Sequence, residues 1–210
     1  MVNINMKRKY MIQKTEEMNI TMHAKCWDDV VALSIDQYPW DENGYKPITE
    51  AKLIYNENGI AVLFQSDETE VLARFTGINE PVCKDSCVEL FLNPNPTGSA
   101  DYLNIEVSAA GGILIGKGPV RGNRKDLDTI VPEQFQIEKE IRKDGWALKL
   151  FVPFAFLEEQ YGTIEKEMGG NLQKCGDDTV HPHFGCWNPI VAPQPDFHRP
   201  ECFGELVLEA

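Results

Sequence analysis

Short segments in which apolar and polar residues alternate recur along most of this chain, and turn-forming residues separate them. The clearest example lies at 50–66, where EAKLIY and IAVLFQS flank the turn sequence NENG. Alternation with a period of two indicates strands that bury one face, and two such runs around a short Asn/Gly turn predict a β-hairpin. Because similar runs return roughly every ten residues, we predict an all-β chain, folded as an antiparallel β-sandwich of the immunoglobulin-like or jelly-roll type.

The same reasoning places the other strands and one helix. Further strands are predicted over 71–76, 85–92, 102–108, 112–117, 135–142, 146–152 and 203–209. The segment PFAFLEEQYG predicts a short helix, because Pro153 suits a first helical turn and Gly162 suits a helix end. The weakly patterned stretch 118–133 is expected to run over the surface. No linker, repeat or low-complexity tract divides the sequence, so we expect 1–210 to form one domain with a polar leader at 1–20.

The net charge of −13 and the pI near 4.7 limit the partners that this protein can have. Nucleic acids and anionic membranes are bound through Lys and Arg, so we expect neither as a partner. The N-terminus lacks the apolar core of a signal peptide, and no stretch approaches the roughly 20 apolar residues of a membrane span. We therefore expect a cytoplasmic protein whose six cysteines are reduced. The oligomeric state is left open.

The C-terminal stretch Asn171–Ala210 is the part of the chain richest in reactive side chains. It holds three of the four histidines and three of the six cysteines. Its proline, glycine and polar turn formers predict an irregular segment rather than a helix or strand throughout. We expect a long loop between Leu172 and the closing strand. Long loops on a rigid scaffold commonly provide binding sites, so this loop is a candidate.

A second candidate region is formed by the predicted strands 85–92 and 102–108. Glu89 in the first strand, and Asn104 and Glu106 in the second, lie on the face opposite the apolar side chains. If the strands are neighbours, these side chains form one polar patch on the concave side of a sheet. Carboxylates and amides in fixed positions suit sugar hydroxyls. An ordinary solvated sheet face is the alternative interpretation.

The order of several segments carries a family resemblance that covers nearly the whole chain from Cys26 onward. These segments are CWDDVVAL, AKLIYNENGIAVLFQ, DSCVELFLN, YLNIEVS, GWALKLFVPF and FHRPECFGELVL. Their order and spacing resemble those of carbohydrate-binding modules of family 9 and of related DOMON-type sandwiches. The resemblance implies a β-sandwich that binds a small mono- or oligosaccharide without hydrolysing it, on a concave sheet face and the C-terminal loop.

The resemblance also implies roles for individual residues. The family's sugar-binding carboxylate falls on Glu89, and a polar contact on the next strand falls at or near Glu106, where a family module carries a basic residue. Of two aromatic residues that hold the sugar ring, one falls on Phe197 and the other on Cys83, which cannot stack. The candidates for a second ring face are Trp40, Tyr45 and Phe75.

Other assignments rest on position within the matching motifs. Trp187 matches a tryptophan that we expect to be structural. The candidate contacts beside the sugar, none of them a family residue, are Arg74, Lys84, Asp85 and His198. Because some family members bind calcium structurally, the resemblance allows a structural Ca²⁺, for which no ligands are assigned.

A glycoside hydrolase-like enzyme is one alternative function. Such enzymes use two carboxylates that flank the scissile bond. Glu89, Glu106 and Asp85 could supply the pair, with Asp177 at the mouth of the site. Two facing carboxylates with raised pKa values would favour the enzyme, whereas a lone carboxylate beside a flat aromatic ring would favour the binding protein.

A metal- or haem-binding sandwich is the other alternative. His and Cys side chains bind zinc, and the weak candidates in the C-terminal loop are His181, His183 and Asp177. The two histidines could equally order the loop through hydrogen bonds. No methionine stands where a haem ligand would be needed. Cys83 and Cys87 match no metal or redox motif, so we expect them to be small buried hydrophobic residues.

Overall fold

The computed structural model describes residues 7–210, and every structural statement below concerns this part of the chain. The strands are β1 (Lys9–Lys14), β2 (Leu33–Ser34), β3 (Thr49–Asn56), β4 (Gly59–Ser66), β5 (Cys87–Asn93), β6 (Tyr102–Ser108), β7 (Ile113–Gly118), β8 (Lys125–Asp126), β9 (Glu138–Arg142), β10 (Gly145–Pro153), β11 (Glu167–Cys175), β12 (Phe184–Cys186) and β13 (Gly204–Leu208). The helices are α1 (Phe154–Tyr161) and the 3₁₀ turns η1 (Lys25–Trp27), η2 (Val82–Lys84), η3 (Arg121–Asn123), η4 (Pro132–Phe135) and η5 (Pro200–Cys202).

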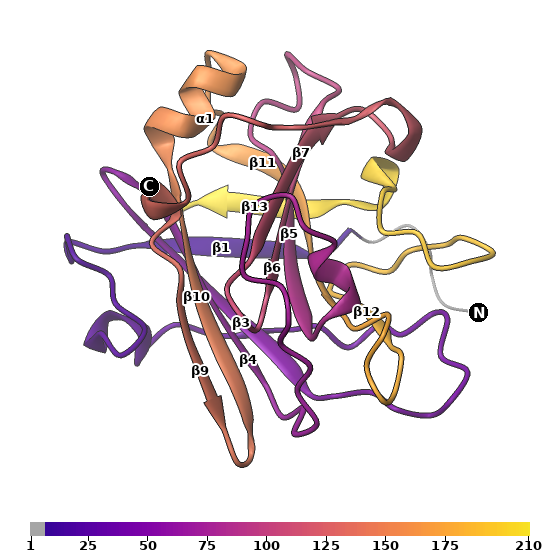
Figure 1. The fold of residues 1–210 in the computed structure, drawn as a ribbon. Helices are drawn as coiled ribbons and strands as arrows, with labels where there is room; N and C mark the ends of the chain where they lie inside the picture. Colours follow the sequence, from indigo (N-terminus) through magenta and orange to yellow (C-terminus); the bar gives the residue numbers. More distant parts are fainter. Residues whose placement is uncertain (1–6) are drawn as a thin grey trace.

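The strands form one path of hydrogen-bonded neighbours, in the order β8-β7-β6-β5-β11-β13-β1-β3-β4-β10-β9, with β12 beside β11 and β2 beside β3. Strand β1 connects the two layers, because Tyr10 pairs with Leu206 of β13 and Gln13 pairs with Ile54 of β3 (Figure 1). Both of these pairings are parallel. The prediction of an all-β, sandwich-like fold is confirmed, but the prediction of a purely antiparallel one is wrong at β1.

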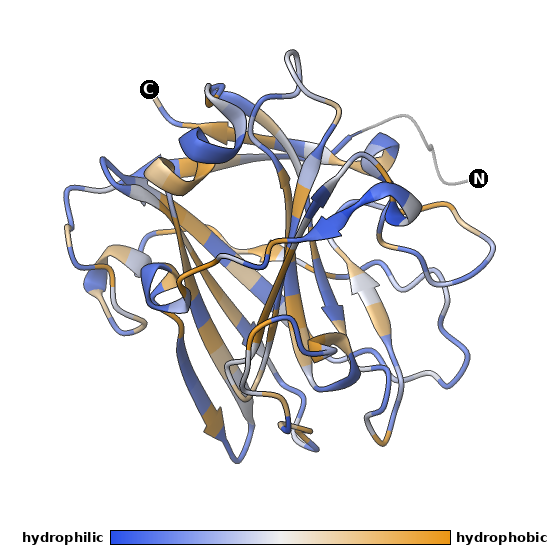
Figure 2. Cartoon of the chain, turned by 45° about the horizontal axis from the view of Figure 1, so that its top comes forward, coloured by the Kyte–Doolittle hydropathy of each residue, from blue (hydrophilic) through white to orange (hydrophobic). Residues whose placement is uncertain are grey.

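Three apolar clusters hold the layers together. The largest contains side chains of both layers, such as Leu90 of β5 and Leu150 of β10, together with the tryptophan Trp187 that we expected to be structural. A second cluster packs Trp27 and its neighbours against Leu63 on the other face of β4. The third cluster packs the C-terminal loop, including Phe197, against β5, β6 and β11. Hydrophobic residues accordingly concentrate on the strands, and most connecting loops are hydrophilic (Figure 2).

The predicted helix is confirmed as α1, with Pro153 at its N-cap and Gly162, at a φ of 73°, just after its last turn. None of the helices in residues 7–210 has the length and apolar character needed to cross a membrane. The stretch 118–133 does run largely as loop, containing only η3, the short β8 and the start of η4.

The strand predicted at 71–76 is wrong. The segment has no sheet partner, because side chains accept its backbone hydrogen bonds. Ser86 Oγ accepts from the Leu72 amide at 3.0 Å, and the Asp85 carboxylate accepts from the Arg74 and Phe75 amides. The backbone donors are therefore satisfied without a ladder.

Five strands occupy segments for which no strand was predicted: the short β2, β8 and β12, and the longer β1 and β11. Strand β1 lies inside the predicted polar leader, of which residues 1–6 fall outside the described part of the chain. Strand β11 begins before the predicted loop and extends to Cys175, so it forms the centre of the layer that carries the site. The long C-terminal loop is real, but it begins after Cys175 rather than at Leu172, and the short β12 interrupts it.

Candidate functional site

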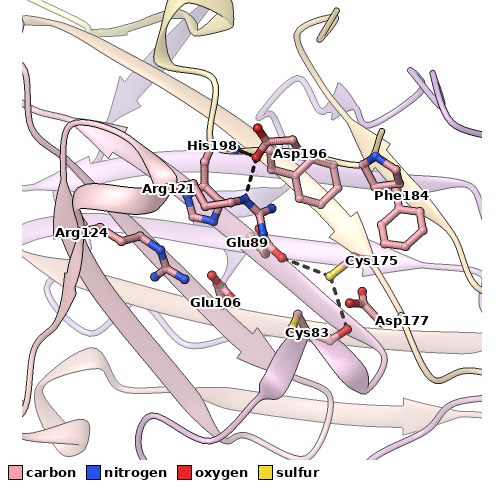
Figure 3. A pocket seen from close by; sticks show the side chains of 12 residues that line it. Cys83, Glu89, Glu106, Arg121, Arg124, Cys175, Asp177, Phe184, Asp196 and His198 are labelled. Atoms are coloured by element: carbon pink, nitrogen blue, oxygen red, sulfur yellow. Dashed lines mark hydrogen bonds and ion pairs between the residues drawn. The ribbon is translucent and has the colours of Figure 1, made fainter. Parts of the chain in front are cut away.

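A pocket of about 230 Å³ opens on the outer face of the layer β5-β6-β11. Glu89 of β5, Glu106 of β6 and Cys175 of β11 line it from the sheet. The loop around η3 contributes Arg121, and the C-terminal loop contributes His198 (Figure 3). Phe197 of the C-terminal loop also lines the pocket. The two regions that the sequence singled out, the polar strand pair and the C-terminal loop, therefore meet at one pocket.

Two glutamates stand side by side in the pocket. Glu89 and Glu106 are directly opposite each other in the antiparallel register of β5 and β6, and their exposed fractions are only 3% and 5%. Burial, together with the facing Glu106 carboxylate, raises the pKa of Glu89 well above its usual value. Burial also raises the pKa of Glu106, although the Arg124 charge and a 2.9 Å hydrogen bond from Asn104 Nδ2 oppose the rise. The predicted patch of Glu89, Asn104 and Glu106 is thus real, and it is buried rather than solvated.

Thiol groups border this carboxylate pair. Cys175 Sγ donates a hydrogen bond to Glu89 Oε1 at 3.1 Å. Cys175 is directly opposite Cys87 across β11 and β5, and burial raises the pKa of the Cys87 thiol to about 11. Cys83, at the position where the family resemblance implies an aromatic residue, lines the pocket wall. The expectation of buried small residues holds for Cys87, which is fully buried, whereas Cys83 is only partly buried.

Two arginines that sequence reasoning missed complete the pocket. Arg121 and Arg124 come from the weakly patterned loop after β7, and Arg121 Nε donates to Asp196 Oδ1 at 2.9 Å. Gly116 of β7 makes room for Arg124, because a Cβ there would lie 2.6 Å from Arg124 Nη1 and 2.6 Å from Asn104 Oδ1. The available signal was the pair of cations in RGNR, within a chain of net charge −13.

Aromatic rings form one side of the pocket. Phe197 lines it as predicted, and Phe184 of β12, which was not predicted, lines it too. Their ring centroids are 6.4 Å apart with an interplanar angle of 60°, so the two rings contact each other instead of facing across a gap. Trp40, proposed as a second ring face, packs on Phe197 at 5.7 Å and does not line the pocket. The other two candidates, Tyr45 and Phe75, do not line it either.

The predicted residue His198 lines the pocket as an uncharged ring. Its Nδ1 forms a 2.8 Å hydrogen bond with the Tyr102 hydroxyl, and its ring packs at 4.8 Å from that of Phe91. Burial and the charges of Arg124 and Arg121 lower the pKa of His198 to about 3. The ring is therefore neutral at physiological pH.

Four other predicted contact residues lie outside the pocket lining. Asn104 is completely buried, and its Nδ2 donates to Glu106 Oε1. Asp85 is completely buried, where it accepts hydrogen bonds from the 71–76 segment and pairs with Arg74 Nε at 2.8 Å. Arg74 also pairs with Asp178 at 3.1 Å, so its guanidinium group is paired with two carboxylates outside the pocket. Lys84 is exposed on η2. Asp85 and Arg74 lie outside the pocket because the Asp85 carboxylate binds the backbone amides of the 71–76 segment, in place of a neighbouring strand, and holds Arg74 there.

The weak metal candidates are not brought together. His183 is buried, with its Nε2 2.6 Å from Lys174 Nζ and its Nδ1 2.7 Å from the carbonyl of His181. His181 is half-exposed and pairs with Glu70 at 3.3 Å, while Asp177 lines the pocket. Both histidines therefore order the loop, as the alternative interpretation held, and they form no ligand cluster with Asp177 within residues 7–210.

These features define a class of protein: a β-sandwich with one small, polar, aromatic-edged pocket on a sheet face, covered by loops. Residues 21–208 match the family described as carbohydrate-binding family 9, and the chain belongs to this family. Most of the chain is included in this match, in agreement with the resemblance seen in the sequence.

Solved structures show the same fold. A Bacteroides uniformis protein, provisionally described as carbohydrate-binding, has 26% identity and a TM-score of 0.82, with 97% of this chain and 100% of that one covered. A family 9 carbohydrate-binding module from Caldicellulosiruptor kristjanssonii in complex with glucose has 14% identity and a TM-score of 0.68, covering 96% of each chain. Its complex with cellotriose has 15% identity, a TM-score of 0.68, and coverage of 96% and 94%. No curated protein sequence matches the chain.

Proposed function

We propose that this protein is a non-catalytic carbohydrate-binding protein, and that the pocket over β5 and β6 holds one unit of a small saccharide. The observation that carries the proposal is the meeting of Glu89 and Glu106 with the ring of Phe197 in one pocket. At about 230 Å³, the pocket is smaller than the roughly 300–1,000 Å³ of sites for drug-sized ligands. This size favours a single sugar ring, or the end of a short oligosaccharide such as those bound by the similar structures.

The charges of the pocket suit hydroxyl groups. A carboxyl group with a raised pKa keeps its proton over a wider pH range than usual, and in that range it both donates and accepts hydrogen bonds. Glu89 and Glu106 therefore match hydroxyls, which also do both. Arg121 and Arg124 add donors only. Phe197 offers one apolar edge, since its exposed fraction is 7%. A sugar held by one aromatic side and several hydrogen bonds is expected to bind more weakly than one stacked between two rings.

Calorimetry with glucose, cellotriose and a panel of other mono- and oligosaccharides tests the proposal. Wild type is compared with Phe197→Ala and with the matched control Phe75→Ala, whose ring lies outside the pocket. We expect the first substitution to abolish binding and the second to preserve it, with circular dichroism confirming that both variants are folded. Absence of binding to every saccharide by folded wild-type protein would refute the proposal.

Hydrolysis of a glycosidic bond is the second candidate function, because two facing carboxylates with raised pKa values are present. The two side chains, however, extend from adjacent strands on the same side of the pocket, whereas an acid and its partner must flank the scissile bond. We therefore expect no release of reducing ends from oligosaccharides or of phenol from aryl glycosides. Turnover that disappears in Glu89→Gln would establish the enzyme instead.

Three further expectations from the sequence stay proposals. They are a cytoplasmic location, a wider relationship to DOMON-type sandwiches, and the exclusion of nucleic acid and membranes as partners. The acidic net charge of −13 supports the last of these. Fractionation of the cells that express the protein, and gel-shift and vesicle-sedimentation assays, test the first and the last.

A further inference from the structure

Beneath the pocket, three potential metal ligands converge. One ligand atom from each of Cys87, Glu89 and Cys175 lies within 4.8 Å of the other two, and all three residues are buried. This is the one such group of His, Cys, Asp and Glu side chains in residues 7–210. It differs from the loop histidines in that two thiols and a carboxylate replace imidazole.

The spacing fits a tetrahedral ion. Bonds of roughly 2.3 Å to sulfur and 2.0–2.2 Å to oxygen place neighbouring ligand atoms of a tetrahedral zinc site about 3.5–3.8 Å apart. The three atoms lie within 4.8 Å of one another, so small side-chain adjustments bring them to that spacing. Cys175 Sγ and Glu89 Oε1, now 3.1 Å apart, would need to separate by only a fraction of an ångström. The backbone is rigid here, because Cys87 and Cys175 are direct partners across β5 and β11, and Glu89 follows on the same face of β5.

The site can be reached from the pocket and has ligand atoms suited to a thiophilic ion. Glu89 and Cys175 both line the pocket, so an ion can reach them from solvent, while Cys87 lies behind them. Asp177 and Cys83 line the same pocket and add two further potential metal ligands (Figure 3). The two sulfur ligands select thiophilic cations.

We propose that Cys87, Cys175 and Glu89 form a binding site for a thiophilic divalent cation of the zinc class, with its fourth coordination position open toward the pocket. The metal site goes beyond the proposed saccharide function and does not depend on it. Because Glu89 belongs to both, a bound ion would replace its carboxyl group as the sugar contact at that point of the pocket.

Cobalt(II) serves as the probe, because it occupies zinc sites and reports thiolate ligation by a charge-transfer band in the near ultraviolet. Reduced wild-type protein, stripped with a chelator, is titrated with Co²⁺ in the absence of any sugar. We expect one equivalent to produce the band and one equivalent of Zn²⁺ to remove it. Saccharide calorimetry on the same stripped protein is a separate measurement, so the two proposals can fail independently.

Variants assign the ligands. Cys87→Ser and Cys175→Ser are each expected to halve the band intensity per cobalt and to weaken Co²⁺ binding at least tenfold. Glu89→Gln should retain the band while weakening binding at least tenfold. The matched control is Cys186→Ser, since Cys186 is a buried thiol that belongs to no ligand group. Wild-type protein without a thiolate band, or an equal loss in Cys186→Ser, would overturn the proposal whether or not the other variants fold.

Discussion

Two buried clusters of ionisable side chains lie on opposite faces of β11, one residue apart in the sequence. On the inner side, Lys174 Nζ lies 2.9 Å from Glu68 Oε2 and 2.6 Å from His183 Nε2, and Trp146 Nε1 donates to the same glutamate at 2.9 Å. On the outer side, Cys175 contacts Glu89, which faces a second carboxyl group instead of a cation.

The pKa values of the two glutamates move in opposite directions. Burial alone would raise the pKa of Glu68, but the charge and hydrogen bond of Lys174 bring the pKa below its usual value. Burial and the neighbouring Glu106 raise the pKa of Glu89. Two glutamates that are both almost fully buried therefore differ in their pairing. The charge of Glu68 is compensated by Lys174, whereas Glu89 and Glu106 have no such ion-pair partner within residues 7–210 and can bind a ligand.

The largest effect is expected when the inner pair is broken. Lys174→Met leaves Glu68 buried without a cation and should reduce the free energy of unfolding by about 3–5 kcal/mol. Urea denaturation at pH 7 measures this loss. The double variant Lys174→Met/Glu68→Gln is the control, and it should recover most of the stability because no charge then remains to be compensated. If Lys174→Met were as stable as wild type, the pairing of Lys174 with Glu68 would not contribute to stability.

The contribution of Glu89 to stability should change with pH in the opposite direction to that of Glu68. Because the pKa of Glu89 is raised on folding, its carboxyl group favours the folded state below the unfolded pKa of about 4.3, and this contribution is lost as pH rises through the folded pKa. Relative to Glu89→Gln, the unfolding free energy of wild type should therefore fall with rising pH, by up to about 1.4 kcal/mol per pH unit.

Glu68→Gln supplies the contrast for that measurement. The pKa of Glu68 is lowered on folding, so its contribution is present above the unfolded value and lost as pH falls through the folded pKa. Urea titrations from pH 3 to 8 compare both variants with wild type. A constant difference between wild type and Glu89→Gln over this range would contradict the assignment of a raised pKa.

A smaller effect is expected at the neutral histidine of the pocket. Tyr102→Phe removes the hydroxyl that contacts His198 Nδ1 and should cost about 1 kcal/mol of stability. Tyr161→Phe is the matched control, because the buried Tyr161 hydroxyl has no hydrogen-bond partner in residues 7–210 and its removal should cost nothing. NMR signals of the His198 ring should not move between pH 5 and 8. An equal loss of unfolding free energy in Tyr102→Phe and Tyr161→Phe would show that the Tyr102–His198 hydrogen bond does not stabilise the protein.

The smallest effect concerns Arg124, whose charge acts on Glu106 of the outer pair. Arg124→Gln removes a charge that holds the pKa of Glu106 down, so that pKa should rise further, while global stability changes by less than about 0.5 kcal/mol. The ¹³C shift of the labelled Glu106 carboxyl group follows the titration. Arg142→Gln, on the β9-β10 hairpin, is the control and should leave the titration unchanged. An unshifted curve in Arg124→Gln would mean that the two groups do not interact.

Local patterns were sufficient for much of the fold. The alternation in IAVLFQS and YLNIEVS predicted β4 and β6, and Pro153 and Gly162 marked α1, because these signals depend on neighbouring residues alone. Strand β11 was missed for the opposite reason. In the sequence, its Gly169–Gly170 pair and its Lys174 are typical of a loop. In the structure, β5 pairs with this segment and Glu68 pairs with the buried Lys174, so it forms a strand. Tertiary context decides such segments.

The site was predictable in part. Strand alternation placed Glu89 and Glu106 on the face that carries the pocket, and the family resemblance singled out Phe197, which lines it. Asn104 shares that face but does not line the pocket. Arg124 came from a loop whose course no local pattern encodes. The pairing of Cys87 with Cys175 depends on a register between strands far apart in sequence, which composition and spacing cannot provide.

The position of β1 has a consequence for biosynthesis. Strand β1 pairs with β3, which is made early, but Lys9 pairs with Glu205 of β13, so β1 obtains its second neighbour only when nearly all of the described chain has left the ribosome. Until then β1 has an open edge toward β13, and β11 has one on the other side of the same gap. Because such distant pairings form slowly, vectorial folding should stall with two unpaired edges. A nascent chain released before β13 is made would expose both unpaired edges. We expect chaperones that bind extended segments to bind such a chain.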